Sequence, residues 1–140
     1  MYDTDNKLKV CINRFNYAND IDLYSTDKLI DYMIAFESLY LKDNKELSYK
    51  LSIRVACFLG KDKNEKEQIF KEIKKAYNIR SKMVHGRTFN IDSPIKFKKR
   101  ELSFEEFLVI VECHLRNSIY KLVKIGKIPN WDKIVLMGNK

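Results

Sequence analysis

Apolar residues recur every three or four positions along most of this chain, which is the spacing of an amphipathic α-helix. Short polar breaks separate five such stretches, at residues 5–18, 25–41, 45–59, 64–86 and 103–123. The 140 residues include only four glycines and two prolines, too few for the many turns of an all-β fold. This pattern predicts an all-α, up-and-down bundle of about five helices. We expect one domain over residues 1–126, followed by a C-terminal tail over 127–140.

Several helix ends carry recognisable signals. Ser103 and Glu106 match the S-x-x-E capping box and predict the start of the last helix. Asn64 and Glu67 have the same spacing, and they predict the start of the fourth helix. Gly60 follows the third helix at the position where a left-handed cap residue is common.

The remaining segments are less regular. Residues 88–100 contain Pro94 and are predicted to form a loop. The tail holds Trp131 and an apolar run over 134–137, which is consistent with a short strand or with an irregular strap packed on or extending from the bundle.

Composition narrows the function classes. The net charge of +8 and the pI of about 9.3 favour a polyanionic partner, although the abundance of Lys, Ile, Asn and Tyr also fits an AT-rich coding sequence. The three cysteines lie far apart and there are only two histidines, so the sequence predicts no disulfide framework, metal site or cofactor. No signal core or membrane-length apolar segment is present, which favours a cytoplasmic protein without a membrane partner.

Polar residues interrupt the apolar stripes of three predicted helices. The stripe of the fourth helix continues from Ile73 and Ala76 to Arg80, at a position that is normally buried. Glu37 lies on the apolar side of the second helix, and Arg54 lies near that of the third. Buried charges need partners, so Arg80 is expected to face a carboxylate, an interface or a bound anion. A structural ion pair of Glu37 with Arg54 or Arg80 remains an alternative.

Arg80 and His85 form an R-x4-H sequence at the end of a helix. The segment YNIRSKMVHG, together with the upstream segments IAFESLYL, ELSYKL and RVACFLG, resembles the HEPN superfamily, in particular ApeA-like HEPN domains, over about residues 14–125. Some branches of the family place Asn after the motif arginine, where this chain has Ser81. The toxin branch has Tyr two residues after the histidine, where this chain has Arg87, so regulation through that tyrosine is not expected.

The resemblance implies a helical homodimer that brings Arg80 and His85 of both protomers to one composite site. Many HEPN domains cleave RNA without a metal, which implies a metal-independent endoribonuclease of a prokaryotic defence or toxin-like system. Arg80 and His85 would then be catalytic, with Glu37, Ser81 and Arg54 in supporting or orienting roles. Arg87, Lys82 and Lys75 are candidates for contacts with RNA.

The residue types suit this chemistry. Attack of the ribose 2′-hydroxyl on the adjacent phosphate needs a base, an acid and positive charge, and it leaves a 2′,3′-cyclic phosphate and a 5′-hydroxyl. Histidine, with an ordinary pKa of about 6.5, serves as base or acid near neutrality. A guanidinium can donate two parallel hydrogen bonds to two oxygens of one phosphate. On a regular helix, however, residues five positions apart point about 140° away from each other, so convergence needs a loosened helix end before Gly86 or a dimer.

Other interpretations of the same residues stay open. His85 also fits a histidine that caps a helix C-terminus, and His114, in the middle of a helix, fits a partly buried or surface residue better than a catalytic one. Some HEPN domains are non-catalytic modules that dimerise or dock a protein or nucleic acid partner. A domain that binds small nucleotides is a further alternative.

Overall fold

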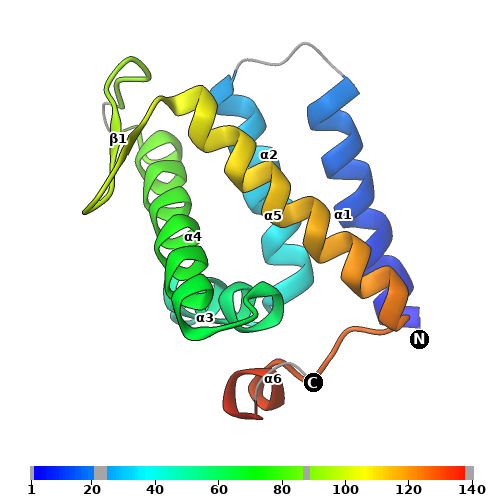
Figure 1. Cartoon of the computed structure of the whole chain (residues 1–140). Helices are drawn as coiled ribbons and strands as arrows, with labels where there is room; N and C mark the ends of the chain where they lie inside the picture. The colour runs from blue at the N-terminus through cyan, green and yellow to red at the C-terminus, as the bar shows by residue number, and fades with distance from the viewer. Residues whose placement is uncertain (1, 21–24, 87–88, 138–140) are drawn as a thin grey trace.

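The computed structural model describes residues 2–20, 25–86 and 89–137, and this part of the chain is an all-α bundle (Figure 1). Its six helices are α1 (Tyr2–Asp20), α2 (Ser25–Tyr40), α3 (Leu47–Leu59), α4 (Lys63–Val84), α5 (Phe104–Ile125) and α6 (Trp131–Met137). Five of them correspond to the five stretches predicted from the apolar spacing. No helix of the described residues is both long and apolar enough to span a membrane.

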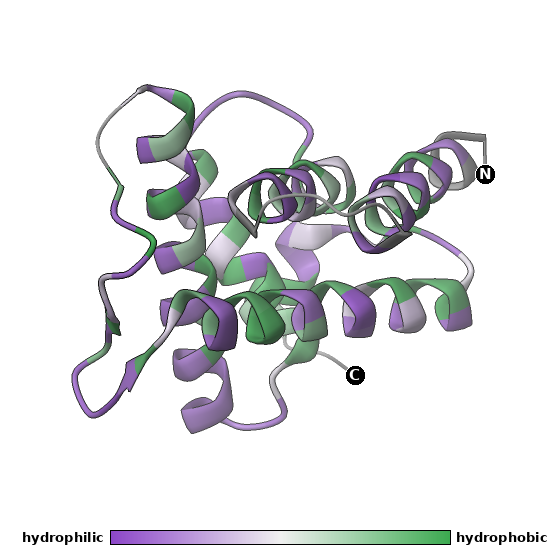
Figure 2. Cartoon of the chain, turned by 90° about the horizontal axis from the view of Figure 1, so that it is seen from above, coloured by the Kyte–Doolittle hydropathy of each residue, from purple (hydrophilic) through white to green (hydrophobic). Residues whose placement is uncertain are grey.

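The helices pack as two hairpins joined by α5. Helix α1 packs against α2, helix α3 packs against α4, and α5 crosses between the two pairs, in contact with all four (Figure 1). Hydrophobic and hydrophilic residues alternate along each helical ribbon, as expected for amphipathic helices with one buried side (Figure 2).

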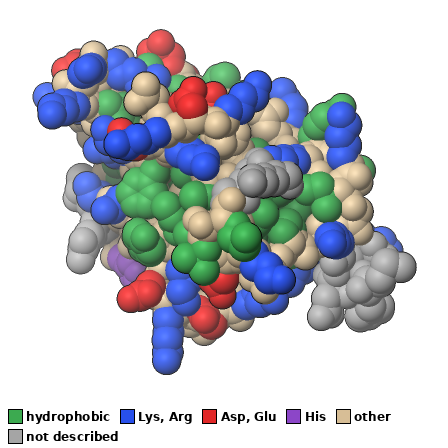
Figure 3. Space-filling model, turned by 60° about the horizontal axis from the view of Figure 1, so that its bottom comes forward, with side chains coloured by type: hydrophobic (Ala, Val, Ile, Leu, Met, Phe, Trp, Pro, Cys, Tyr) green, Lys and Arg blue, Asp and Glu red, His purple; other side chains and the backbone are tan. Residues whose placement is uncertain are grey.

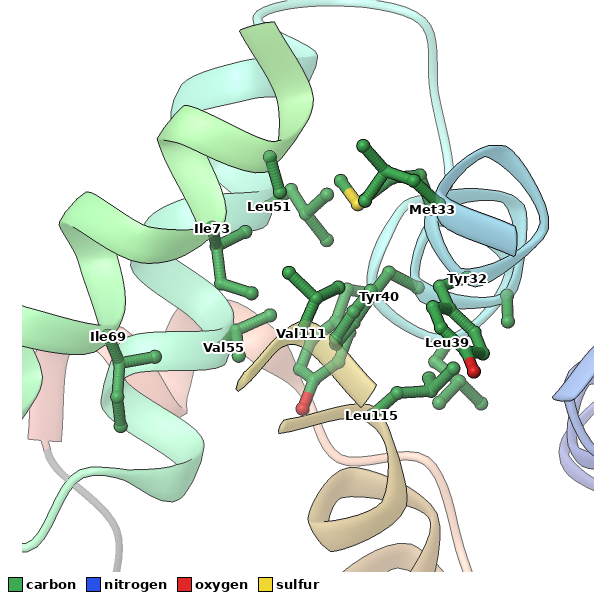
Figure 4. Close-up of a cluster of buried hydrophobic side chains, with 14 of the residues drawn as sticks. Tyr32, Met33, Leu39, Tyr40, Leu51, Val55, Ile69, Ile73, Val111 and Leu115 are labelled. Carbon is green, nitrogen blue, oxygen red and sulfur yellow. The ribbon is translucent and has the colours of Figure 1, made fainter. Parts of the chain in front are cut away.

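The core lies where α2, α3, α4 and α5 meet. Figure 4 shows apolar side chains from these four helices pointing toward one another. The largest of them are fully buried, and they include Tyr32, Tyr40, Phe36, Phe58, Leu51, Ile73 and Leu115. The Tyr40 hydroxyl is paired with the Ser118 hydroxyl at 2.7 Å, so the polar end of this buried ring is satisfied.

Helix ends match the predictions in part. Ser103 and Glu106 form the predicted capping box at the start of α5, and Gly126 ends that helix with φ +80°. Helix α4 starts two residues earlier than predicted, because Asp62 rather than Asn64 is its N-cap and accepts a hydrogen bond from the Glu65 N–H.

Gly60 is required for a different reason than the one predicted. Its φ of −74° is not left-handed. A Cβ at this position would instead lie 2.5 Å from Lys66 Cγ and 2.7 Å from the Ala56 carbonyl oxygen. The absence of a side chain at Gly60 thus lets the stem of Lys66 pack directly on the end of α3.

Two elements differ from the prediction. The segment predicted as a loop contains a short antiparallel hairpin of β1 (Ile95–Lys96) and β2 (Glu101–Leu102). The tail forms helix α6, not a strand or an irregular strap. Trp131 holds it on the bundle: its ring is buried against Tyr40 and Phe58, and its indole N–H donates to the Leu39 carbonyl at 3.2 Å.

Candidate functional site

Arg80 lies in the last turns of α4 and pairs with Glu37 of α2. Arg80 Nη2 is 3.5 Å from Glu37 Oε1, and the two side chains are 22% and 25% exposed. Of the two partners predicted for Glu37, the structure thus selects Arg80 and not Arg54. The apolar stripes of α2 and α4 bring both residues to the contact between these helices, at its solvent-accessible border.

The Arg80–Glu37 pair is incompletely satisfied. Glu37 Oε1 and Arg80 Nε are both buried atoms without a hydrogen-bond partner among the described residues. Most buried polar atoms in proteins have such a partner, and leaving one without costs about 1–3 kcal/mol. The guanidinium therefore retains hydrogen-bonding capacity that the described residues do not use.

His85 is exposed at the end of α4. Its backbone φ of −87° and ψ of 11° leave the helix, its N–H bonds to the Ser81 carbonyl at 3.0 Å, and Gly86 follows with φ +71°. Because α4 stays helical to Val84, Arg80 and His85 point about 140° apart. No hydrogen bond or ion pair joins them in the described chain. The described chain by itself therefore does not bring the two motif residues together.

The other residues of the predicted site lie in different surroundings. Ser81 is half-buried beside Arg80, and Lys82 is exposed in the last turn. The Lys75 ammonium lies 5.6 Å from the centre of the Phe97 ring, over the hairpin segment. Arg87 lies outside the described residues.

Arg54 has other partners than Arg80 and Glu37. Its Nη1 donates to the Tyr40 carbonyl at 2.6 Å, and its Nη2 lies 3.8 Å from Asp132 Oδ1. A carbonyl in the last turn of a helix has no partner within the helix, so Arg54 satisfies the end of α2 and ties it to α6.

Arg80 and His85 do not line any of the hollows beside Asp31, Glu72, Phe70 and Trp131. The described residues also contain no group of three or more His, Cys, Asp or Glu side chains placed to hold a metal ion.

A second polar cluster, centred on Glu72, was not predicted. Glu72 of α4 is 4% exposed. Its Oε1 lies 2.7 Å from His114 Nε2, and its Oε2 accepts from Gln68 Nε2 at 2.8 Å and from the Arg100 guanidinium. Burial alone would raise the pKa of Glu72, but the hydrogen bonds from His114, Gln68 and Arg100 outweigh it, and the pKa is lowered.

The sequence did contain a signal for this cluster. Glu72 lies three residues after Ile69 and four before Ala76. It therefore belongs to the same apolar stripe of α4 in which Arg80 is a charged residue. His114, expected to be partly buried or on the surface, has a side chain that is 14% exposed. It contributes one of the bonds that satisfy Glu72.

Comparisons of the chain with models of protein families, with curated proteins and with solved structures found no match. The resemblance to HEPN domains therefore remains a prediction that depends on the residues quoted above.

Proposed function

We propose that the protein is a metal-independent endoribonuclease of the HEPN type, with Arg80 and His85 at its active site. The observation that carries the proposal is the state of Arg80: a partly exposed guanidinium, held at one end by Glu37, whose Nε has no partner in the described chain. Five residues later, at the same helix end, His85 is exposed. A phosphate-binding group and a proton-transfer group thus lie at one edge of the bundle.

The proposed reaction assigns one role to each residue. A ribose 2′-hydroxyl loses its proton to one His85 imidazole and attacks the adjacent phosphorus. The P–O5′ bond breaks, and a second His85, in its protonated form, donates a proton to the departing 5′-oxygen. The products are a 2′,3′-cyclic phosphate and a 5′-hydroxyl. Arg80 stabilises the negative charge on the pentacoordinate phosphate, and Glu37 orients the guanidinium.

The proposed active unit is a homodimer. One protomer points Arg80 and His85 in different directions and offers one histidine, whereas the reaction needs both an acid and a base. A two-fold axis near the ends of the α4 helices would supply two arginines and two histidines to one cleft. The same proposal places the enzyme in the cytoplasm, in a defence or toxin-like system.

A non-catalytic docking module is the second candidate. The observation in its favour is that Arg80 and His85 line none of the hollows beside Asp31, Glu72, Phe70 and Trp131. In that case the polar end of α4 would contact a protein or nucleic acid partner without chemistry. The Arg80 guanidinium would then complete its hydrogen bonds across the interface.

Cleavage of labelled RNA in the presence of EDTA separates the two candidates. Structured and unstructured RNAs are incubated with the wild type and with the Arg80→Ala, His85→Ala and Arg116→Ala variants. Arg116 is the matched control, because its guanidinium is exposed on α5 and pairs with Glu112 in the same helix. Each variant is first checked for folding by circular dichroism.

We expect the wild type and Arg116→Ala to leave cyclic-phosphate ends at similar rates. Loss of either motif residue should lower the rate by a factor of about 100 or more, as for other groups that act only in the transition state. Absence of cleavage by the wild type would favour the docking module. Equal cleavage by all four proteins would contradict the assignment of Arg80 and His85.

A further inference from the structure

A groove lies between the N-terminal half of α4 and the C-terminal half of α5. Its volume is about 1140 Å³, and Leu59, Gly60 and Met137 are among the residues that line it. The polar side chains along its walls include four lysines, Lys61, Lys66, Lys121 and Lys124, as well as Tyr120 and His114. The volume of the groove exceeds the roughly 300–1,000 Å³ of ordinary small-molecule sites, which suits a larger ligand.

Positive charge dominates this groove. The buried carboxylate on its wall, Glu72, is already balanced by Arg100 and His114. Glu65 is the other acidic residue on the walls, and its Oε1 accepts a hydrogen bond from the Lys61 backbone N–H. Figure 3 shows the face that is turned forward from the bottom of Figure 1, where Lys and Arg side chains and some acidic ones surround a hydrophobic area.

One of the four lysines is engaged by the protein. Lys121 Nζ donates to the Phe58 carbonyl at 2.6 Å, and burial lowers the pKa of Lys121. The other three, Lys61, Lys66 and Lys124, form no ion pair with a carboxylate of the described residues. The stem of Lys66 is held in place because it packs on Gly60.

An aromatic ring lies beside these charges. Tyr120 is 62% exposed on the α5 wall, and the Lys124 ammonium lies 4.7 Å from the centre of its ring. An exposed ring next to a cation is the combination that binds single-stranded nucleic acids, because bases stack on the ring while lysines neutralise phosphates.

We propose that the α4–α5 groove binds a stretch of single-stranded RNA, with Lys66 and Lys124 on its phosphates and Tyr120 stacked on a base. The choice of RNA over other anions rests on the proposed function. Lys66 and Arg80 are 14 residues apart on one continuous helix, so Lys66 lies about 21 Å along α4 from Arg80. A strand held in the groove is therefore anchored at a distance from the site of cleavage.

Binding is measured apart from cleavage with an RNA that cannot react. A fluorescein-labelled, 2′-O-methylated oligonucleotide of about 12 nucleotides lacks the attacking hydroxyl and is long enough for a site of this type. Fluorescence anisotropy gives its Kd for the wild type, for a Lys66→Gln/Lys124→Gln variant and for a Lys9→Gln/Lys45→Gln control. The control removes the same charge from exposed positions outside the groove.

We expect the groove variant to bind at least about tenfold more weakly, with a salt dependence smaller by one to two counterions. The control should change the Kd less than about threefold, and Tyr120→Ala should weaken binding by about fivefold or more. Equal losses in the groove variant and the control, or no loss in either, would overturn the inference. Binding in the groove without cleavage of unmodified RNA would instead contradict the proposed nuclease activity, while the proposal that the groove binds RNA would stand.

Discussion

Glu72 and Glu37 are both acidic residues on the inward sides of helices, but their surroundings differ. Glu72 is 4% exposed, and both of its carboxylate oxygens have hydrogen-bond partners, from His114, Gln68 and Arg100. Glu37 is paired with one cation at 3.5 Å, and its buried Oε1 has no hydrogen-bond partner among the described residues.

The difference separates a structural cluster from a candidate site. Glu72 lies where α4 and α5 meet, close to Arg100 at the hairpin turn, so its bonds with His114 and Arg100 join parts of the chain that are distant in sequence. A fully satisfied buried carboxylate of this kind holds elements together. The Arg80–Glu37 pair joins only α2 and α4 and leaves donor and acceptor atoms unused, which is the state expected of groups that bind a ligand or a second protomer.

The largest effect should follow from removal of the Glu72 carboxylate. Glu72→Ala leaves His114 and Arg100 without their partner, and we expect it to lower the free energy of unfolding by roughly 3 kcal/mol, less than a fully buried pair would cost because Arg100 is partly exposed. Glu37→Ala should cost about 1 kcal/mol or less. Urea unfolding followed by circular dichroism measures both, and equal losses would remove the distinction between the two carboxylates.

The contribution of Glu72 should also depend on pH. Its pKa is lower in the folded protein than its ordinary value of 4.5, so the folded state favours the ionised form. The stabilisation is complete above about pH 4.5 and is lost as the pH falls through the folded pKa. The difference in unfolding free energy between the wild type and Glu72→Gln should therefore shrink below pH 4.5. A difference that stays constant from pH 7 to pH 3 would show that the charge of Glu72 does not stabilise the fold.

The smallest effect on stability is expected for Glu37→Gln. This change keeps the size of the side chain and removes an ion pair that lacks hydrogen-bond geometry. The free energy of unfolding should therefore change by about 0.5 kcal/mol or less. If Glu37 orients Arg80, the rate of RNA cleavage should nevertheless fall by about tenfold. A large loss of stability with an unchanged rate would reverse the roles given to Glu37 and Glu72.

The helices were predictable because their signals are local. The apolar spacing located α1 to α5, and Ser103 with Glu106 fixed the start of α5. The hairpin has only two residues in each strand, too few for an alternating pattern to appear. The tail is held by contacts of Trp131 with Tyr40 and Phe58, which are far away in sequence, so its seven residues gave no clear period.

The candidate site was predictable to a similar extent. Charged residues in apolar stripes indicated that Arg80 and Glu37 lie between helices, but only the fold shows that they pair with each other. Arg54 donates to a backbone carbonyl at the end of α2, and a pattern of side chains in the sequence cannot predict such a partner. Glu72 shares the spacing of Ile69 and Ala76, so its buried side could have been predicted, but its partners Arg100 and His114 come from distant parts of the sequence.

The NMR signal of the Arg80 guanidinium is a direct measure of whether this residue binds RNA. In a ¹⁵N-labelled protein, the arginine Nε–H signals are assigned by single substitutions, and the 2′-O-methylated oligonucleotide is added. We predict that the Arg80 Nε–H signal shifts when the guanidinium binds a phosphate, while the signal of Arg100, already bound to Glu72, stays in place. A stationary Arg80 signal at saturating oligonucleotide would contradict a role for Arg80 in RNA binding.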